Sequence, residues 1–144
     1  MNADTNSIIR AYLVGQTTLT DIVSTRIYCP RLPEGATLPA VGFFTRGGVP
    51  NPHIESLPMP SVQFDCWAKD EAALAGPIGA RQVYRALFDV LQGIQNVNVV
   101  IGTDTYRILS AVQEVEGQDL QDIDIPTYYR VLTFFKIDIQ ATPT

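Results

Sequence analysis

The chain has 144 residues, of which 46% are hydrophobic and 17% are charged, and its formal net charge is −5. This size and apolar content predict one globular domain over residues 1–144 and exclude a disordered chain. The acidic balance argues against a general nucleic-acid-binding surface, because such surfaces neutralise phosphates with basic side chains. No apolar run approaches the roughly 20 residues of a membrane-spanning helix, and residues 1–18 lack the basic start and apolar core of a signal peptide. We therefore expect a protein that is made in the cytoplasm and contacts no membrane.

The N-terminal part predicts two short helices and a first strand. Capping residues at 4–6 and apolar residues at helical spacing predict a helix over 6–14, which Gly15 ends. A second short helix is expected over 19–23. Ile27 and Tyr28 predict a brief strand that Pro30 ends. Prolines between positions 29 and 39 then hold the chain in an extended path that leads into a strand over 40–46.

The middle of the chain combines a proline-rich segment with a clearly alternating one. Residues 47–60 contain four prolines and two glycines, which predicts a long loop or a loosely paired ribbon. The stretch SVQFDCWAK predicts a half-buried strand over 61–69, with Cys66 on the buried side. Trp67 lies on the other side, and two roles stay open for it: contact with a partner, or packing beneath the following helix.

The second half predicts one main helix and three strands. Asp70 is expected to cap a helix that begins at Glu71, is interrupted at Gly76 and Pro77, and continues over 78–91 as an amphipathic helix. Residues 96–102 and 106–115 predict a hairpin. An acidic loop over 116–126 is expected before a long final strand over 127–140 that is covered on both faces. The fold class is therefore predicted as α+β: a mostly antiparallel sheet with one main amphipathic helix packed on it and a short N-terminal helix.

A search for catalytic chemistry yields little. His53 is the only histidine and lies in the proline-rich segment, where we expect a solvated side chain. Cys29 and Cys66 are expected to be free thiols that pack. The acidic residues from Glu114 onward lack the central glycine and closing glutamate of an EF-hand loop, so we expect them to be solvated or to face a partner. We predict no enzyme activity, metal or cofactor; a small enzyme that uses Cys66 or the acidic loop is the less favoured alternative.

Long loops on a sheet indicate a protein that presents surfaces to partners. The predicted partner-contacting residues fall in the proline-rich segment, the alternating strand and the acidic loop: Gly47, Gly48, Asn51, His53, Met59, Trp67, Glu116, Asp119, Asp122 and Asp124.

Four pieces of the sequence occur in an order that is typical of one family: Arg-Ile-Tyr at 26–28, Leu-Pro at 32–33, Leu-Pro-Ala at 38–40, and Val-Gln-Phe-Asp-Cys-Trp-Ala at 62–68. With the alanine-rich helix and the long final strand that follow, the chain resembles the phage tail-completion family, whose members are described as tail terminators or tail-to-head joining proteins. The resemblance is carried by the ordered set, because no single piece is diagnostic.

The resemblance implies a virion structural protein without enzymatic activity or cofactor. Six copies would form a ring at the head-proximal end of the tail, end polymerisation of the tube, and join the tail to the head connector. Its partners would be further copies of itself, the tail tube protein and the connector or stopper protein. Genomic DNA would pass through the lumen without specific binding. The alternatives are a neck or stopper protein, or an assembly factor of similar fold that is absent from the mature particle.

Overall fold

A six-stranded sheet is the centre of the fold. The structure, a computed structural model, describes residues 4–49, 57–71 and 75–143. The strand order is β1-β2-β3-β6-β5-β4. The strands are β1 (Ile27–Tyr28), β2 (Ala40–Val49), β3 (Met59–Lys69), β4 (Gln95–Ile101), β5 (Asp104–Gln121) and β6 (Tyr128–Gln140). Because β1 runs parallel to β2 whereas the other neighbours are antiparallel, the sheet is mixed and not purely antiparallel.

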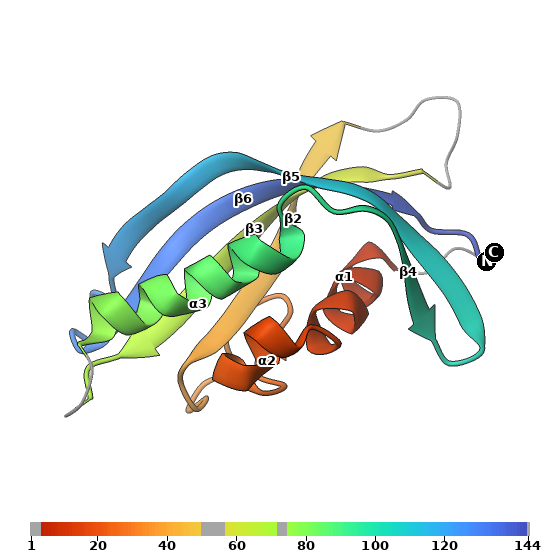
Figure 1. Cartoon of the computed structure of the whole chain (residues 1–144). Coiled ribbons are helices and arrows are strands. Elements are labelled where there is room, and N and C mark those ends of the chain that lie inside the picture. The colour runs from red at the N-terminus through yellow and green to blue at the C-terminus, as the bar shows by residue number, and fades with distance from the viewer. Residues whose placement is uncertain (1–3, 50–56, 72–74, 144) are drawn as a thin grey trace.

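Three helices lie on the same face of the sheet, which curls around them (Figure 1). They are α1 (Thr5–Val14), α2 (Thr17–Val23) and α3 (Gly76–Leu91). The predicted single main helix is correct only in part. The longest helix is α3, but α1 also buries four side chains, including Ile8, Ile9 and Leu13, and the two N-terminal helices extend the helical layer. No helix formed by the described residues lies on the other face of the sheet.

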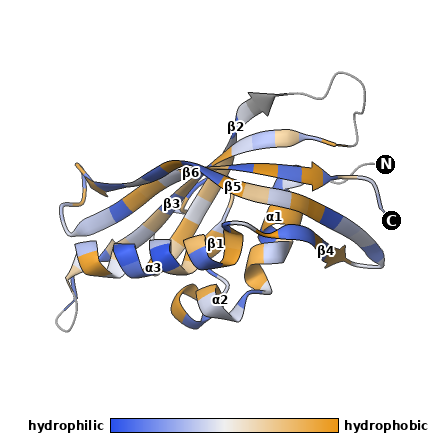
Figure 2. Ribbon diagram, turned by 45° about the horizontal axis from the view of Figure 1, so that its top comes forward, coloured by the Kyte–Doolittle hydropathy of each residue, from blue (hydrophilic) through white to orange (hydrophobic). Residues whose placement is uncertain are grey.

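The core is built from side chains that alternate inward along the central strands. Phe43, Phe64 and Phe135, on adjacent strands β2, β3 and β6, are fully buried. The rings of Phe43 and Phe64 stack with centroids 5.6 Å apart, and Phe64 meets Phe135 edge-on at 5.8 Å. Such pairs stabilise a core beyond the area that they bury. Figure 2 shows hydrophobic and hydrophilic residues alternating along α3 and the long strands, as a layer with one buried side requires.

Most predicted elements are confirmed, and two boundaries are wrong. The first is the start of the main helix, which begins at Gly76 and not at Glu71. Pro77 explains this, because proline is tolerated in the first turn of a helix but disrupts an interior. The N-cap residue is Ala75 and not Asp70, although Asp70 Oδ1 still accepts a hydrogen bond from the Gly76 backbone N–H, in the first turn of the helix, at 2.7 Å.

The second wrong boundary is the predicted acidic loop over 116–126. Strand β5 continues to Gln121 and pairs with β6, for example Asp119 with Val131 and Gln121 with Tyr129. Only a short turn over 122–127 connects the two strands. The polar composition was misleading because an edge strand that faces water can carry many charges.

The proline-rich segment is partly a paired ribbon. β2 extends to Val49, where Gly48 pairs with Pro60 and Val49 with Met59. The pairing register shifts between Thr45 and Gly48, and the backbone at Gly47 has φ +99°. The ribbon alternative is therefore confirmed for the described part of this segment.

Candidate interaction surface

The face of the sheet that points away from the helices, here called the helix-free face, is the candidate interaction surface. Strand alternation places Phe44, Trp67 and Phe134 on it, and all three side chains are partly exposed. Their chain neighbours Phe43 and Cys66 point into the core. Of the two roles left open for Trp67, packing beneath the main helix is wrong, because α3 covers the opposite face.

A buried carboxylate lies at the centre of the helix-free face. Asp65 is only 8% exposed, so the half-buried strand predicted from alternation is in fact covered on both sides. The guanidinium of Arg130 lies 3.3 Å from Asp65 Oδ1, and the Gln63 amide donates to the same carboxylate at 3.3 Å. Arg130 also lies over the Trp67 ring, 5.4 Å from its centroid. Burial raises the pKa of Asp65, while Arg130 and the Gln63 hydrogen bond act in the opposite direction.

A second arginine continues this network toward the β2–β3 ribbon. Arg46 Nη1 donates to Gln63 Oε1 at 2.8 Å. Its guanidinium lies 5.8 Å from the ring centroids of both Phe44 and Phe134. The helix-free face therefore combines aromatic rings with arginines stacked on them. Arginine and aromatic residues are enriched at the centres of protein–protein interfaces.

The segment from Cys29 to Pro39, here called the strap, crosses one side of this face. A Cβ at Gly42 of β2 would lie 3.4 Å from the backbone nitrogen of Leu32, so the strap lies directly on the strand. Arg26 Nε donates to the Pro39 carbonyl at 2.9 Å and fixes the point where the strap enters β2. The extended path predicted for this segment is wrong: the strap bends at residues 29–31 and turns at Glu34–Gly35, where the Ala36 N–H donates to the Pro33 carbonyl at 3.2 Å and Gly35 has φ +73°.

The β5–β6 turn is the second segment that lies beside Trp67, and hydrogen bonds hold its backbone. Asp122 Oδ1 accepts from the N–H groups of Asp124 at 2.8 Å and Ile125 at 3.1 Å. The Asp122 N–H donates to the Tyr128 carbonyl at 2.9 Å. This arrangement exposes Ile123 by 94%, which is unusual for a large apolar side chain. The turn therefore presents an apolar tip between two carboxylates.

A groove of about 300 Å³ lies between the strap and this turn, and we call it the strap–turn groove. Trp67 and Tyr128 contribute aromatic surface. Residues 31–36 of the strap form one wall, which includes Leu32 and Pro33, and the turn contributes Asp122 and Ile125. The groove is thus mainly apolar and aromatic, with charged groups at its rim.

The free edge of β5 beyond β4 is closed by side chains of α3. Arg81 forms an ion pair with Asp119 at 2.8 Å and donates to the Gly117 carbonyl at 3.2 Å. The hydroxyl of Tyr84 accepts from the Gly117 N–H at 3.3 Å. Any other residue at Gly117 would force neighbouring side chains to shift, because a Cβ would lie 2.7 Å from Val131 Cγ1 and 2.9 Å from the Tyr84 ring.

The predicted partner-contacting residues do not form one site. Gly47, Gly48 and Met59 lie at the ribbon end of the sheet, and Trp67 lies toward the other end of β3. The acidic residues lie in β5 or its turn: Glu116, Asp119, Asp122 and Asp124. Asn51 and His53 lie outside the described residues.

Sequence analysis missed the Asp65–Arg130 contact and the strap wall of the groove. Alternation alone put Asp65 and Arg130 on outward faces, which was the available signal. Their contact depends on the pairing of Trp67 with Arg130 across β3 and β6, and a register between distant strands cannot be read from local pattern.

The described residues offer no obvious catalytic group. Both cysteines are free, as predicted. Cys66 is fully buried, and burial raises the pKa of its thiol far above the usual range, which opposes thiolate formation. Burial also raises the pKa of Cys29, and the charge of Asp4 adds to this shift. Within the described ranges, no group of three or more His, Cys, Asp or Glu side chains could hold a metal ion.

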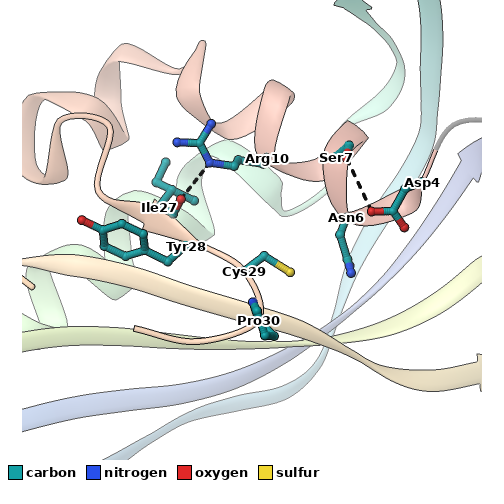
Figure 3. Close-up of a pocket in the computed structure, with 8 residues that line it drawn as sticks. All are labelled: Asp4, Asn6, Ser7, Arg10, Ile27, Tyr28, Cys29 and Pro30. Carbon is teal, nitrogen blue, oxygen red and sulfur yellow. Dashed lines mark hydrogen bonds between the residues drawn. The ribbon is translucent and has the colours of Figure 1, made fainter. Parts of the chain in front are cut away.

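A cavity of about 570 Å³ lies between α1 and the chain around β1 (Figure 3). Its polar groups bond mainly to the protein itself. Arg10 Nε donates to the Ile27 carbonyl at 2.9 Å, and Ser7 donates to Asp4 at 3.4 Å. Asn6 accepts a hydrogen bond from Thr45 at 2.8 Å. The cavity therefore holds no activated nucleophile or convergent set of free polar groups.

The chain matches no protein-family model and no curated protein. None of the helices formed by the described residues has the length and apolar character that crossing a bilayer requires.

Proposed function

We propose that the chain is a ring-forming structural protein of a phage virion. In this proposal it acts as a tail terminator at the head-proximal end of the tail, where it ends tube polymerisation and joins the tail to the head connector. The ordered resemblance at residues 26–28, 32–33, 38–40 and 62–68 supplies the role. The protein has no enzymatic activity and acts by contact alone.

The observation that carries the proposal is the one-sided packing of the sheet. All three helices cover one face, so the arginine–aromatic surface of the other face is left for contact with neighbours. Ring closure needs two different surfaces on each subunit, because the contact between successive subunits is heterologous. The ribbon at one end of β3 and the strap–turn groove at the other supply two surfaces of unlike shape and chemistry.

The charge supports a passive path for DNA. A net charge of −5 gives a duplex little to bind, because affinity for DNA comes mainly from cations that neutralise phosphates. DNA can therefore move through the centre of such a ring without being held. The tail tube protein and the connector or stopper protein would contact the two rims of the ring.

Light scattering over a concentration series, combined with negative-stain imaging of the purified protein, tests the proposal. We expect closed rings with an opening on the order of 20 Å or more, the space that a DNA duplex needs. We also expect the chain in purified particles, at the junction of tail and head. A protein that stays monomeric at every concentration and is absent from particles contradicts the proposal. Rings that form alone but are absent from mature particles would indicate the assembly-factor alternative.

A further inference from the structure

The strap–turn groove has the chemistry of a binding site for an extended, proline-containing segment. Trp67 and Tyr128 supply aromatic surface, and Leu32, Pro33 and Ile125 supply apolar walls. Aromatic-lined grooves bind proline-rich segments because these segments are already extended and lose little conformational entropy on binding. Hydrogen bonds within each wall fix its shape: the Ala36 N–H donates to the Pro33 carbonyl at 3.2 Å in the strap, and Asp122 Oδ1 accepts from two backbone N–H groups of the turn.

We infer that this groove binds residues 50–56 of a second copy of the chain. This inference rests on the proposed function for its requirement that copies associate. The segment reads Pro-Asn-Pro-His-Ile-Glu-Ser, so it contains two prolines and an isoleucine that suit an aromatic and aliphatic groove. It lies outside the described residues, between Val49 and Leu57.

The groove lining holds one cation and two carboxylates, and the segment offers a group that can pair with each kind. Arg31 at the rim is exposed and has no ion-pair partner among the described residues. Glu34 and Asp122 add two carboxylates to the same lining. The segment carries one carboxylate, Glu55, and one imidazole, His53. Pairing Glu55 with Arg31 and His53 with the carboxylates would give the contact a defined direction.

The geometry of β3 requires the contact to be between two copies. Met59 lies at the ribbon end of β3 and Trp67 lies at the groove. Eight residues of extended strand separate them by about 26 Å. A segment fixed at Val49 and Leu57 can reach only about 14 Å from its anchors even when fully extended. It cannot fill the groove of its own chain, but it can fill that of a neighbour.

Each copy then donates a segment at one end and accepts one at the other. Such a contact is heterologous, and repeated copies form either a closed ring or an open chain, depending on the rotation between neighbours. The predicted partner-contacting residues at the ribbon end would then contact one neighbouring copy, and those at the groove would contact the other.

A pair of complementary variants tests the inference. The groove variant carries Arg31→Glu and Ile125→Asp, and the segment variant carries Pro50→Gly and Pro52→Gly. A matched control makes the same chemical changes on α3, Arg85→Glu and Ile78→Asp, at exposed positions outside the groove. Circular dichroism verifies that all variants fold. We expect each interface variant alone to associate at least tenfold more weakly than the unmodified chain, and the control to associate normally.

Mixing the two interface variants gives the sharpest result. The groove variant still offers an intact segment, and the segment variant still offers an intact groove, so an equimolar mixture should form heterodimers and nothing larger. Trp67 is the only tryptophan of the chain, so its fluorescence reports directly on occupation of the groove. Variants that associate as strongly as the unmodified chain, or a mixture that stays monomeric, would overturn the inference.

A peptide experiment separates failure of this inference from failure of the proposed function. A synthetic peptide of residues 47–60 is titrated into the segment variant while Trp67 emission is recorded. A saturable change that is lost in the groove variant supports the inference, even if the full chain forms no ring. No change, or an equal change with a scrambled peptide, overturns it. Rings that form normally with the groove variant overturn the inference and leave the ring function intact.

Discussion

Replacing Arg130 by methionine should destabilise the fold by leaving the Asp65 carboxylate buried without its cation. Removal of one partner from a buried ion pair costs about 3–5 kcal/mol. The Arg130 side chain is 34% exposed, however, so water compensates part of this loss. The lost contact with the Trp67 ring adds about 0.5–1 kcal/mol. We therefore expect the free energy of unfolding to fall by about 2 kcal/mol at neutral pH.

The effect should depend on pH in a direction that follows from the pKa of Asp65. Burial already raises this pKa in the folded protein, and removal of Arg130 raises it further. A carboxyl group with a raised folded pKa binds its proton more tightly when folded, so stability falls as pH rises through the folded pKa. At a pH below the folded pKa, Asp65 is protonated in both proteins. The difference between variant and unmodified chain should therefore shrink on acidification.

Urea unfolding followed by far-UV circular dichroism measures both effects. The matched control is Lys136→Met, because Lys136 lies on the same face of β6, is exposed and has no ion-pair partner among the described residues. It should change stability by no more than about 0.5 kcal/mol. Adding Asp65→Asn to Arg130→Met should recover about half of the loss, because no charge then stays buried. Equal losses of stability for Arg130→Met and Lys136→Met, or a loss for Arg130→Met that is independent of pH, would refute the reasoning.

Three further predictions test the rest of the structure. Gly117→Ala should cost about 1–3 kcal/mol in urea unfolding, because the new Cβ overlaps Val131; a second change, Val131→Ala, should not add its full cost, and fully additive losses would contradict this. Asp70→Ala should cost about 0.5–2 kcal/mol by removing the oxygen that accepts from the Gly76 N–H at the start of α3, whereas Asp70→Asn, which keeps an accepting oxygen, should cost less. In a thiol-reactivity assay of the folded protein, Cys29 should react and the fully buried Cys66 should react only after denaturation; equal rates would contradict the packing.

Local pattern was sufficient for the elements whose identity depends on near neighbours in the chain. Alternation along residues 61–69 correctly placed Cys66 in the core and Trp67 on the other side. Helical spacing located the first two helices and most of α3, and the hairpin predicted from residues 96–102 and 106–115 is confirmed by the antiparallel pairing of β4 with β5. These features follow from the two periodicities of backbone geometry, which any short window of residues displays.

The arrangement of these elements depended on contacts between distant parts of the chain. Composition alone indicated a loop at 116–126, but pairing with β6 makes most of it strand. The same alternation that located Asp65 outside could not reveal that Arg130, 65 residues later, would cover it. The strap and the β5–β6 turn meet across Trp67 only because β2, β3 and β6 lie side by side. The sequence by itself thus determined which residues point inward along each element, because that follows from backbone period. The tertiary structure alone decided what covers each face, because strand register and layer packing are set by long-range contacts that no local window contains.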